Sequence, residues 1–220
     1  MIQSVIFDLD GLLIDSEAVS YKIYQEWMKK YGCGFPIDYY AQNLCGRSSV
    51  HNMNLVIQDF HLPLSLEEGL AISTALEEKY VQTGFDLKEG VKELLEFLKT
   101  HKYKISLASS SVRERALTIL KHHDVDHYFD TLTFGYEVPN GKPAPDIFLA
   151  ACGKTGIAPE HSLVLEDSEA GIQAAFSADI PVICVPDMKR PGKEFLEKSL
   201  AVVDSLSQVI NYLQTEKASP

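Results

Sequence analysis

The sequence predicts an α/β protein with a doubly wound, Rossmann-like parallel-sheet core and an inserted α-helical bundle. Short runs of apolar, mostly β-branched residues recur along the chain. Most of these runs are apolar at consecutive positions, as in strands that are buried on both faces of a parallel sheet. From residue 87 onward, helical patterns separate the runs, and such alternation of strand and helix is typical of a doubly wound fold.

The runs that we expect to form strands are residues 4–7, 105–108, 131–134, 162–165, 181–185 and 201–203. The helices between them show apolar residues at the spacing i, i+3, i+4, i+7, which places those residues on one face of a helix. Two clear sets are Val91, Leu94, Leu95 and Leu98, and near the end of the chain Leu206, Val209, Ile210 and Leu213.

About 90 residues separate the first strand from the second, far more than one crossover connection needs. Helical periodicity fills this stretch, for example at Tyr24, Trp27, Met28 and Tyr31. We therefore predict that residues 16–84 form an inserted helical cap domain, and that residues 1–15 and 85–220 form the α/β core. Such an insert would lie over the carboxyl ends of the strands, where open α/β sheets bind ligands.

Charge and hydropathy exclude several classes of protein. The 220 residues include 31 acidic and 20 basic side chains, for a net charge of −11, which argues against a nucleic-acid partner or an anionic membrane surface. No apolar run is long enough to cross a bilayer, and Asp8 and Asp10 interrupt the first run before it resembles a secretory signal. The cysteines lack the spacing of a zinc site. We expect a cytoplasmic protein without membrane contact, and a monomer rather than an oligomer.

Two carboxylates stand at the end of the first predicted strand. Asp8 and Asp10 are followed by Gly11, a residue that favours turns. Placing two acids at the mouth of a buried strand is costly unless a positive group joins them. Carboxylate oxygens suit Mg²⁺. Taken alone, the pattern is equally typical of an acidic pair in a surface loop.

Further polar groups follow later strands. The second strand leads into Ser109-Ser110-Ser111, whose hydroxyl and backbone N–H groups can bind phosphate oxygens at the start of a helix, although serines there are often only helix caps. Lys142 stands between a glycine and a proline, and its ammonium group suits a phosphate or a carboxylate cluster. Glu166 and Asp167 end another strand. Because the carboxyl ends of parallel strands share one edge of a sheet, we expect all these groups to converge.

In combination, these motifs resemble those of haloacid dehalogenase superfamily phosphatases with a helical cap, in the β-phosphoglucomutase-like subgroup. The residues that carry the likeness are Asp8-Leu9-Asp10-Gly11, Ser109, Lys142 in Gly-Lys-Pro-Ala-Pro-Asp, and Glu166-Asp167. The resemblance implies a Mg²⁺-dependent phosphomonoesterase. Such an enzyme would hydrolyse a small phosphorylated metabolite, a sugar phosphate or a nucleotide-like molecule, through an aspartyl-phosphate intermediate.

The resemblance also implies a role for each acid. Asp8 would be the nucleophile, and Asp10 the acid that protonates the leaving oxygen and then the base that activates water. The Asp8 side chain, the Asp10 backbone carbonyl and Asp167 would hold Mg²⁺. Glu166 would be a further ligand or would lie behind the ligands.

The remaining implied roles concern the substrate. Ser109 and the backbone N–H of Ser110 would bind the transferring phosphoryl group, and Lys142 would neutralise charge on Asp8 and the phosphate. In the insert, the candidate substrate contacts are Arg47, Ser16 and Glu17. Arg47 is also compatible with an ordinary surface arginine, and Ser16 and Glu17 with capping of the first inserted helix.

Two alternative functions stay open. An isomerase of the β-phosphoglucomutase type would use the same intermediate and would have to protect it from water. In that pattern a histidine of the first cap helix engages the general acid, whereas Ser20 stands at the matching position here, which favours hydrolysis. A receiver-type signalling module also combines acids, a hydroxyl residue and a lysine on a parallel sheet, but it needs no inserted helices.

Overall fold

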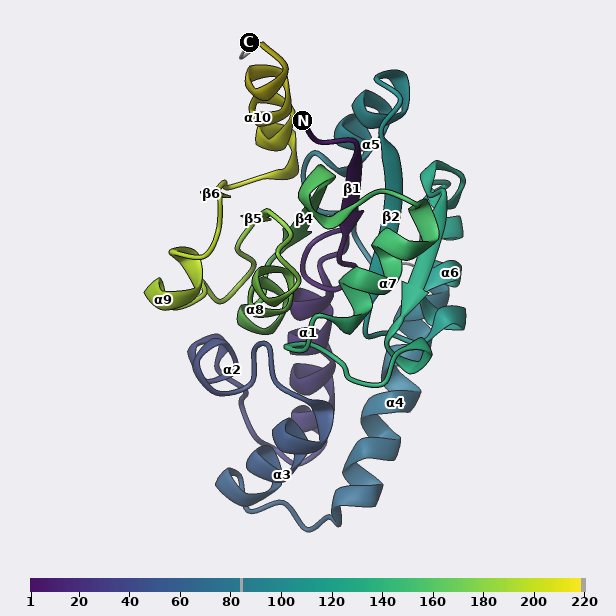
Figure 1. Cartoon of the computed structure of the whole chain (residues 1–220). Coiled ribbons are helices and arrows are strands. Elements are labelled where there is room, and N and C mark those ends of the chain that lie inside the picture. The colour runs from purple at the N-terminus through teal and green to yellow at the C-terminus, as the bar shows by residue number, and fades with distance from the viewer. Residues whose placement is uncertain (84, 219–220) are drawn as a thin grey trace.

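The computed structural model describes residues 1–83 and 85–218 and confirms the predicted fold class (Figure 1). The described residues form a sheet of six strands in the order β3-β2-β1-β4-β5-β6, with every neighbouring pair parallel. The strands are β1 (Ser4–Phe7), β2 (Lys104–Ser109), β3 (Thr131–Phe134), β4 (Ser162–Glu166), β5 (Val182–Cys184) and β6 (Ala201–Val202). Each predicted strand is present, and its ends differ from the prediction by no more than one residue.

Alternate residues of the central strand contribute to opposite faces of the sheet. Val5 and Phe7 belong to one apolar cluster and Ile6 to another. The first cluster also contains residues of α5 (Val91–Thr100), α6 (Arg113–His122) and α10 (Leu206–Ala218). The second contains residues of α7 (Asp146–Thr155) and α8 (Glu169–Ser177). Helices thus cover both faces, which explains why the strands are apolar at consecutive positions.

The chain between β1 and α5 is helical, as the periodicity predicts. Its helices are α1 (Ser16–Lys29), α2 (Ile37–Asn43), α3 (Ser49–Asp59) and α4 (Leu66–Thr83). They lie together beyond the carboxyl ends of the strands (Figure 1), and α4 contacts α1, α3 and the core helix α6. The division into two domains at residues 16 and 84 stays a prediction, and residue 84 lies outside the described residues.

An aromatic cluster fills the space between these helices. The rings of Tyr24 and Phe35 stack with their centroids 5.2 Å apart, and the Phe35 and Phe60 centroids are 5.5 Å apart. The aromatic and methionine stripes of the sequence therefore serve core packing, and Trp27 and Met28 are buried. The buried apolar residues of the insert belong to the same continuous cluster as those on one face of the sheet.

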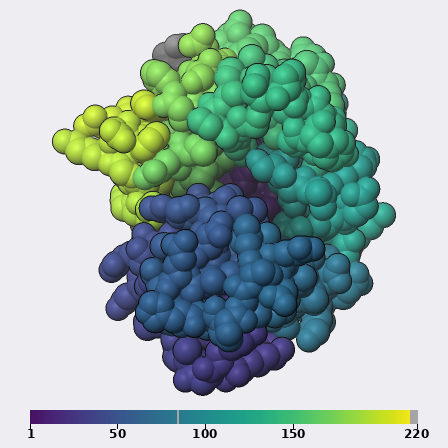
Figure 2. All heavy atoms as spheres, turned by 90° about the horizontal axis from the view of Figure 1, so that it is seen from below, coloured from purple at the N-terminus to yellow at the C-terminus, as the bar shows by residue number. Residues whose placement is uncertain are grey.

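Shorter elements complete the fold. They are α9 (Lys193–Leu196) and single turns of 3₁₀-helix at Asp126–Tyr128, Gly135–Glu137 and Pro159–His161. Figure 2, seen from the side of the insert, shows a hollow between the inserted helices and the core, and a purple N-terminal segment lies within it. No helix among the described residues is long and apolar enough to cross a membrane.

Candidate active site

The register of the sheet brings the predicted polar groups to one edge. Phe7 of β1 pairs with Leu107 of β2 on one side and with Leu165 of β4 on the other. The backbone N–H of Asp8 then donates to the carbonyl of Leu165 over 3.2 Å. Because these parallel strands end at the same level, the residues that follow them face one another across the carboxyl edge of the sheet.

Lys142 joins two of the predicted acids. Its Nζ atom lies 2.5 Å from Oδ1 of Asp8 and 2.6 Å from Oε1 of Glu166. It also donates to the backbone carbonyl of Ala108 over 3.3 Å, and it lies 4.9 Å from the centre of the Phe148 ring. The lysine side chain is 8% exposed and that of Glu166 is 1% exposed. Lys142 is therefore a buried cation that binds carboxylates at the ends of two neighbouring strands, Asp8 after β1 and Glu166 in β4.

Glu166 has protein partners at both of its carboxylate oxygens. While Oε1 binds Lys142, Oε2 accepts hydrogen bonds from the backbone N–H groups of Asp167 and Ser168, each over 3.0 Å, and from the Ser168 hydroxyl over 2.9 Å. Gly171 leaves room for this side chain, because a Cβ atom there would lie 1.8 Å from the Glu166 carboxyl group. The arrangement favours Glu166 as a group that orients Lys142 and the following loop, rather than as a direct metal ligand.

Asp167 packs over the turn that follows Asp8 and Asp10. A Cβ atom on Gly11 would lie 2.3 Å from Oδ2 of Asp167, and Gly11 has a φ of +83°, which favours glycine. Gly11 is therefore the residue that lets the acids of β1 and β4 approach each other.

Burial and mutual repulsion change the proton affinity of the site. Burial raises the pKa of Asp8 to about 7, although Lys142 beside it acts in the opposite direction. Burial, together with the charges of Glu166 and Asp8, raises the pKa of Asp167 well above its ordinary value. Burial disfavours the charged lysine, but the adjacent Asp8 and Glu166 outweigh it and raise the pKa of Lys142.

The balance of charge among the side chains of the site shows whether a divalent cation would fit there. Among the residues that the structure describes, the buried acids Asp8 and Glu166 and the half-buried Asp167 lie near one paired cation, Lys142. The side chains therefore leave negative charge uncompensated beside the oxygens of Asp8 and Asp167. Hard oxygen donors with excess negative charge are what Mg²⁺ prefers, so the donor set fits this metal.

The serine loop lies beside the same edge. Ser109 is 1% exposed, and its hydroxyl oxygen accepts a hydrogen bond from the backbone N–H of Ser111 over 3.0 Å. Ser110 is exposed, and the chain then enters α6 at Arg113. Ser109 thus orders the loop, and the phosphate-binding role of Ser109 and Ser110 stays a prediction.

The carboxylate of Asp10 has a partner that the sequence analysis missed. Both of its oxygens accept hydrogen bonds from Arg115 of α6, with Nη2–Oδ1 at 2.8 Å and Nη1–Oδ2 at 3.1 Å. The Nε atom of Arg115 lies 2.9 Å from Oε1 of Glu77, which belongs to α4 in the insert. The available signal was that Arg115 follows Ser111 by one helical turn, but charged residues at this spacing are ordinary on solvated helix faces.

Of the predicted substrate contacts of the insert, Arg47 and Glu17 line cavities. Arg47 is exposed, has Nη1 3.1 Å from Nε2 of His51, and lines a cavity of about 130 Å³ together with Ser20 and Glu77. Contact between Arg47 and a substrate stays a prediction.

The two predicted residues at the start of α1 are placed differently. Ser16 is buried as the first residue of the helix. Glu17 ties α1 to α2 and to the loop after it, because its carboxylate accepts hydrogen bonds from the Tyr40 hydroxyl of α2 and, over 3.0 Å, from the backbone N–H of Gly46. Glu17 also lines a cavity of about 200 Å³ together with Asp167. A substrate role for either residue stays a prediction.

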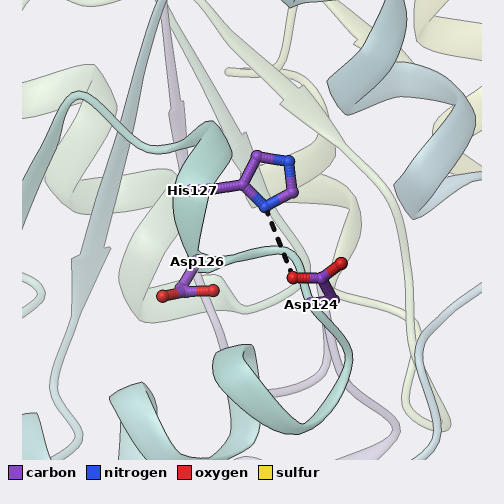
Figure 3. A group of neighbouring side chains, drawn as sticks. All are labelled: Asp124, Asp126 and His127. Carbon is purple, nitrogen blue, oxygen red and sulfur yellow. Dashed lines mark ion pairs between the residues drawn. The ribbon is translucent and has the colours of Figure 1, made fainter.

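A group of possible metal ligands also lies outside this site. Asp124, Asp126 and His127 meet at the turn after α6, where Nδ1 of His127 is 3.8 Å from Oδ1 of Asp124 (Figure 3). Asp124 and His127 are exposed, and exposed acidic groups of this kind are common on protein surfaces. The group shares no residue with the candidate active site.

Comparisons with known proteins found similar sequences and structures along nearly the whole chain. The family model described as haloacid dehalogenase-like hydrolase matches residues 5–185. A phosphorylated carbohydrates phosphatase of Thermotoga maritima is 33% identical over 215 residues, which cover 96% of this chain and 98% of the relative. A crystal structure from Thermotoga maritima has a TM-score of 0.84 at 30% identity, covering 97% of this chain and 99% of its own. A β-phosphoglucomutase structure from Clostridium difficile has a TM-score of 0.73 at 27% identity, covering 99% and 98%.

Proposed function

Because the chain belongs to the haloacid dehalogenase-like hydrolases and is a phosphatase of small phosphorylated metabolites, we propose that it works as a Mg²⁺-dependent phosphomonoesterase through an aspartyl-phosphate on Asp8. The observation that carries the proposal is the contact of Asp8 with Lys142 at the carboxyl edge of the sheet, beside Asp167. A carboxylate paired with a buried ammonium group is available for attack while its charge is partly neutralised.

The proposed reaction has two steps. An oxygen of the Asp8 carboxylate attacks phosphorus, the bond from phosphorus to the leaving oxygen breaks, and Asp10 donates a proton to that oxygen. Water then attacks the phosphorus of the aspartyl-phosphate, Asp10 accepts a proton from it, and inorganic phosphate leaves as the Asp8 carboxylate is restored.

The surrounding groups would bind the charged ester. The Asp8 and Asp167 side chains and the Asp10 backbone carbonyl would hold Mg²⁺, and Glu166 would orient Lys142 beside them. Bound there, Mg²⁺ would offset charge on the phosphoryl oxygens. Ser109 and the backbone N–H of Ser110 would donate hydrogen bonds to the same oxygens. This local compensation is needed because the chain as a whole carries a net charge of −11.

The insert would select the substrate. Arg47, Ser20 and Asn52 line the smaller cavity, and these polar side chains suit a hydroxyl-rich or distally anionic group. The Thermotoga maritima relative is named for phosphorylated carbohydrates, which supports a sugar phosphate as substrate, whereas a nucleotide-like ester stays a prediction. Ser16 and Glu17 are proposed to contact it from the start of α1. That the protein is a monomer and that it is cytoplasmic both stay predictions.

The decisive experiment replaces the proposed nucleophile. Asp8→Asn should abolish turnover of sugar phosphates in the presence of Mg²⁺, because an amide is a poor nucleophile, while circular dichroism and thermal unfolding show an intact fold. Asp38→Asn, on the exposed first turn of α2, is the matched control and should keep full activity. Substantial hydrolysis by Asp8→Asn would overturn the covalent mechanism.

The β-phosphoglucomutase-type isomerase remains the second candidate, favoured by the likeness to the Clostridium difficile structure. Against it, Ser20 of α1 occupies the position where that pattern has a histidine, and a serine hydroxyl is shorter and does not titrate near neutrality. The enzyme should therefore be given β-glucose 1-phosphate with a trace of the 1,6-bisphosphate. We expect inorganic phosphate to form faster than glucose 6-phosphate, and the reverse order would favour the isomerase.

A further inference from the structure

Arg115 connects the core, the insert and the proposed acid–base residue. Its guanidinium group binds both oxygens of Asp10 at 2.8 and 3.1 Å, and it binds Oε1 of Glu77 through Nε at 2.9 Å. Asp10 follows β1, Arg115 belongs to α6, and Glu77 belongs to α4 of the insert. A continuous chain of ion pairs therefore leads from the inserted helices to Asp10.

The guanidinium group is held on several sides. Nη1 also donates to the hydroxyl of Ser111 over 2.9 Å, and the Phe85 ring lies 4.9 Å from the guanidinium carbon. The Arg115 side chain is only 17% exposed, against 37% for Asp10 and 40% for Glu77. Because a guanidinium group is planar and rigid, a partner at Nε constrains the direction in which both Nη atoms point. The position of Glu77 thus constrains the orientation of the Asp10 carboxylate.

We propose that Arg115 is a positioning residue for Asp10, and that its bond to Glu77 makes the orientation of Asp10 depend on how the insert sits on the core. The inference rests on the proposed function, in which Asp10 donates a proton to the leaving oxygen and then accepts one from water. Proton transfer requires the carboxylate within hydrogen-bond reach of the reacting oxygen, so an unrestrained Asp10 would transfer protons less often.

The two reaction steps allow a sharp test with p-nitrophenyl phosphate. Its leaving group departs without a proton, so formation of the aspartyl-phosphate does not need Asp10, whereas hydrolysis of the intermediate does. In Arg115→Met, the first release of p-nitrophenol in a rapid-mixing experiment should keep its rate within about threefold, while steady-state kcat falls about tenfold or more. The KM should fall together with kcat, because slower hydrolysis lets the intermediate accumulate, so kcat/KM should change little. With a sugar phosphate, whose leaving group needs a proton, the first step should slow as well.

Matched variants separate the ion-pair chain from general effects of charge. Glu77→Gln should shift the same two phases in the same direction but less, because Arg115 keeps its contacts with Asp10. Glu78→Gln, at the next position of α4, and Lys121→Met, on the exposed face of α6, should behave like the wild-type enzyme. If Arg115→Met does not fold, the half-exposed Glu77 provides the deciding variant.

Three results would overturn the inference. An equal fall in the burst phase and in steady-state turnover would indicate a structural role for Arg115. A change confined to KM would indicate that Arg115 binds substrate. Unchanged kinetics would show that the contact between Arg115 and Asp10 does not affect catalysis. Asp10→Asn is measured alongside. If that variant also lacks the separation of phases, the proposed two-step function fails, and this outcome is distinguishable from a failure that is specific to Arg115.

Discussion

The Nζ atom of Lys142 lies 2.5 Å from Oδ1 of Asp8, in a place where both side chains are nearly excluded from solvent. The lysine reaches this position from a loop that precedes α7, and the same ammonium group binds Glu166. One cation therefore links the residue that we propose as nucleophile to the acid at the end of β4. The buried contact should matter for both stability and catalysis.

Removal of this cation should be costly. Lys142→Met would leave Asp8 and Glu166 buried without their shared partner, so the free energy of unfolding should fall by about 3–5 kcal/mol. Lys154→Met is the matched control, because Lys154 pairs with Glu137 near the surface and is 36% exposed, so the loss should be about 1 kcal/mol or less. Urea denaturation of both variants in EDTA makes the comparison. Equal losses would mean that the Lys142 pairs contribute no more than a surface ion pair.

Metal and pH should act on stability together. Burial raises the pKa of Asp8 from 3.8 to about 7, so in metal-free protein the folded state binds more protons than the unfolded chain between these values. The stability contribution of Asp8 is therefore complete below the lower value and is lost as the pH rises through the upper one. Asp167 acts in the same direction.

We consequently expect Mg²⁺ to raise the thermal unfolding midpoint more at a pH of about 7.5 than at about 5, where protons already occupy the acids. Thermal melts with EDTA and with Mg²⁺ at both pH values measure this difference. The difference should shrink in Asp8→Asn. An equal metal effect at both pH values would contradict the assignment of these acids as the metal site.

The leaving group should decide how severe the loss of Asp10 is. Asp10→Asn should lower kcat for a sugar phosphate by about 10²–10⁴-fold, the usual contribution of general acid–base catalysis. The first release of p-nitrophenol from its phosphate ester should survive, and phosphorylated Asp8 should accumulate, which peptide mass spectrometry detects after an acid quench. Equal losses in the first step for good and poor leaving groups would count against Asp10 as the acid.

Two helical glycines provide a test of the support behind Glu166. Gly171→Ala in α8 would place a methyl group 1.8 Å from the Glu166 carboxyl group, so the side chain must move away from Lys142. We expect a loss of about 1–3 kcal/mol in stability and a fall in kcat. Gly153→Ala in α7 meets no atom within 4 Å and should stabilise the fold by about 0.4–1 kcal/mol. Urea denaturation and kcat are measured for both variants. Equal changes in the two variants would show that the contact between Gly171 and Glu166 does not hold the Glu166 side chain in place.

Much of the fold follows from local pattern. The strand at 131–134 and the helices around Leu94 and Leu206 can be predicted because each element must bury an apolar face, and its periodicity records that burial along the chain. The meeting of Lys142 with Asp8 and Glu166 was also predictable in outline, since the rule that parallel strands end at one edge needs only the order of the elements.

The contacts of Asp10 and Glu17 depended on the tertiary structure. Arg115 lies 105 residues from Asp10 and 38 from Glu77, and all three carry charges that are equally typical of a solvated surface. Likewise, nothing in the sequence indicated that Glu17 would accept a hydrogen bond from Tyr40. Hydrophobic periodicity reports which face of one element is buried, whereas an ion pair between elements depends on how those elements are oriented against each other. That orientation is set by packing of the insert on the core, which is why the sequence alone determined the sheet and its motifs, and only the tertiary structure decided what holds Asp10.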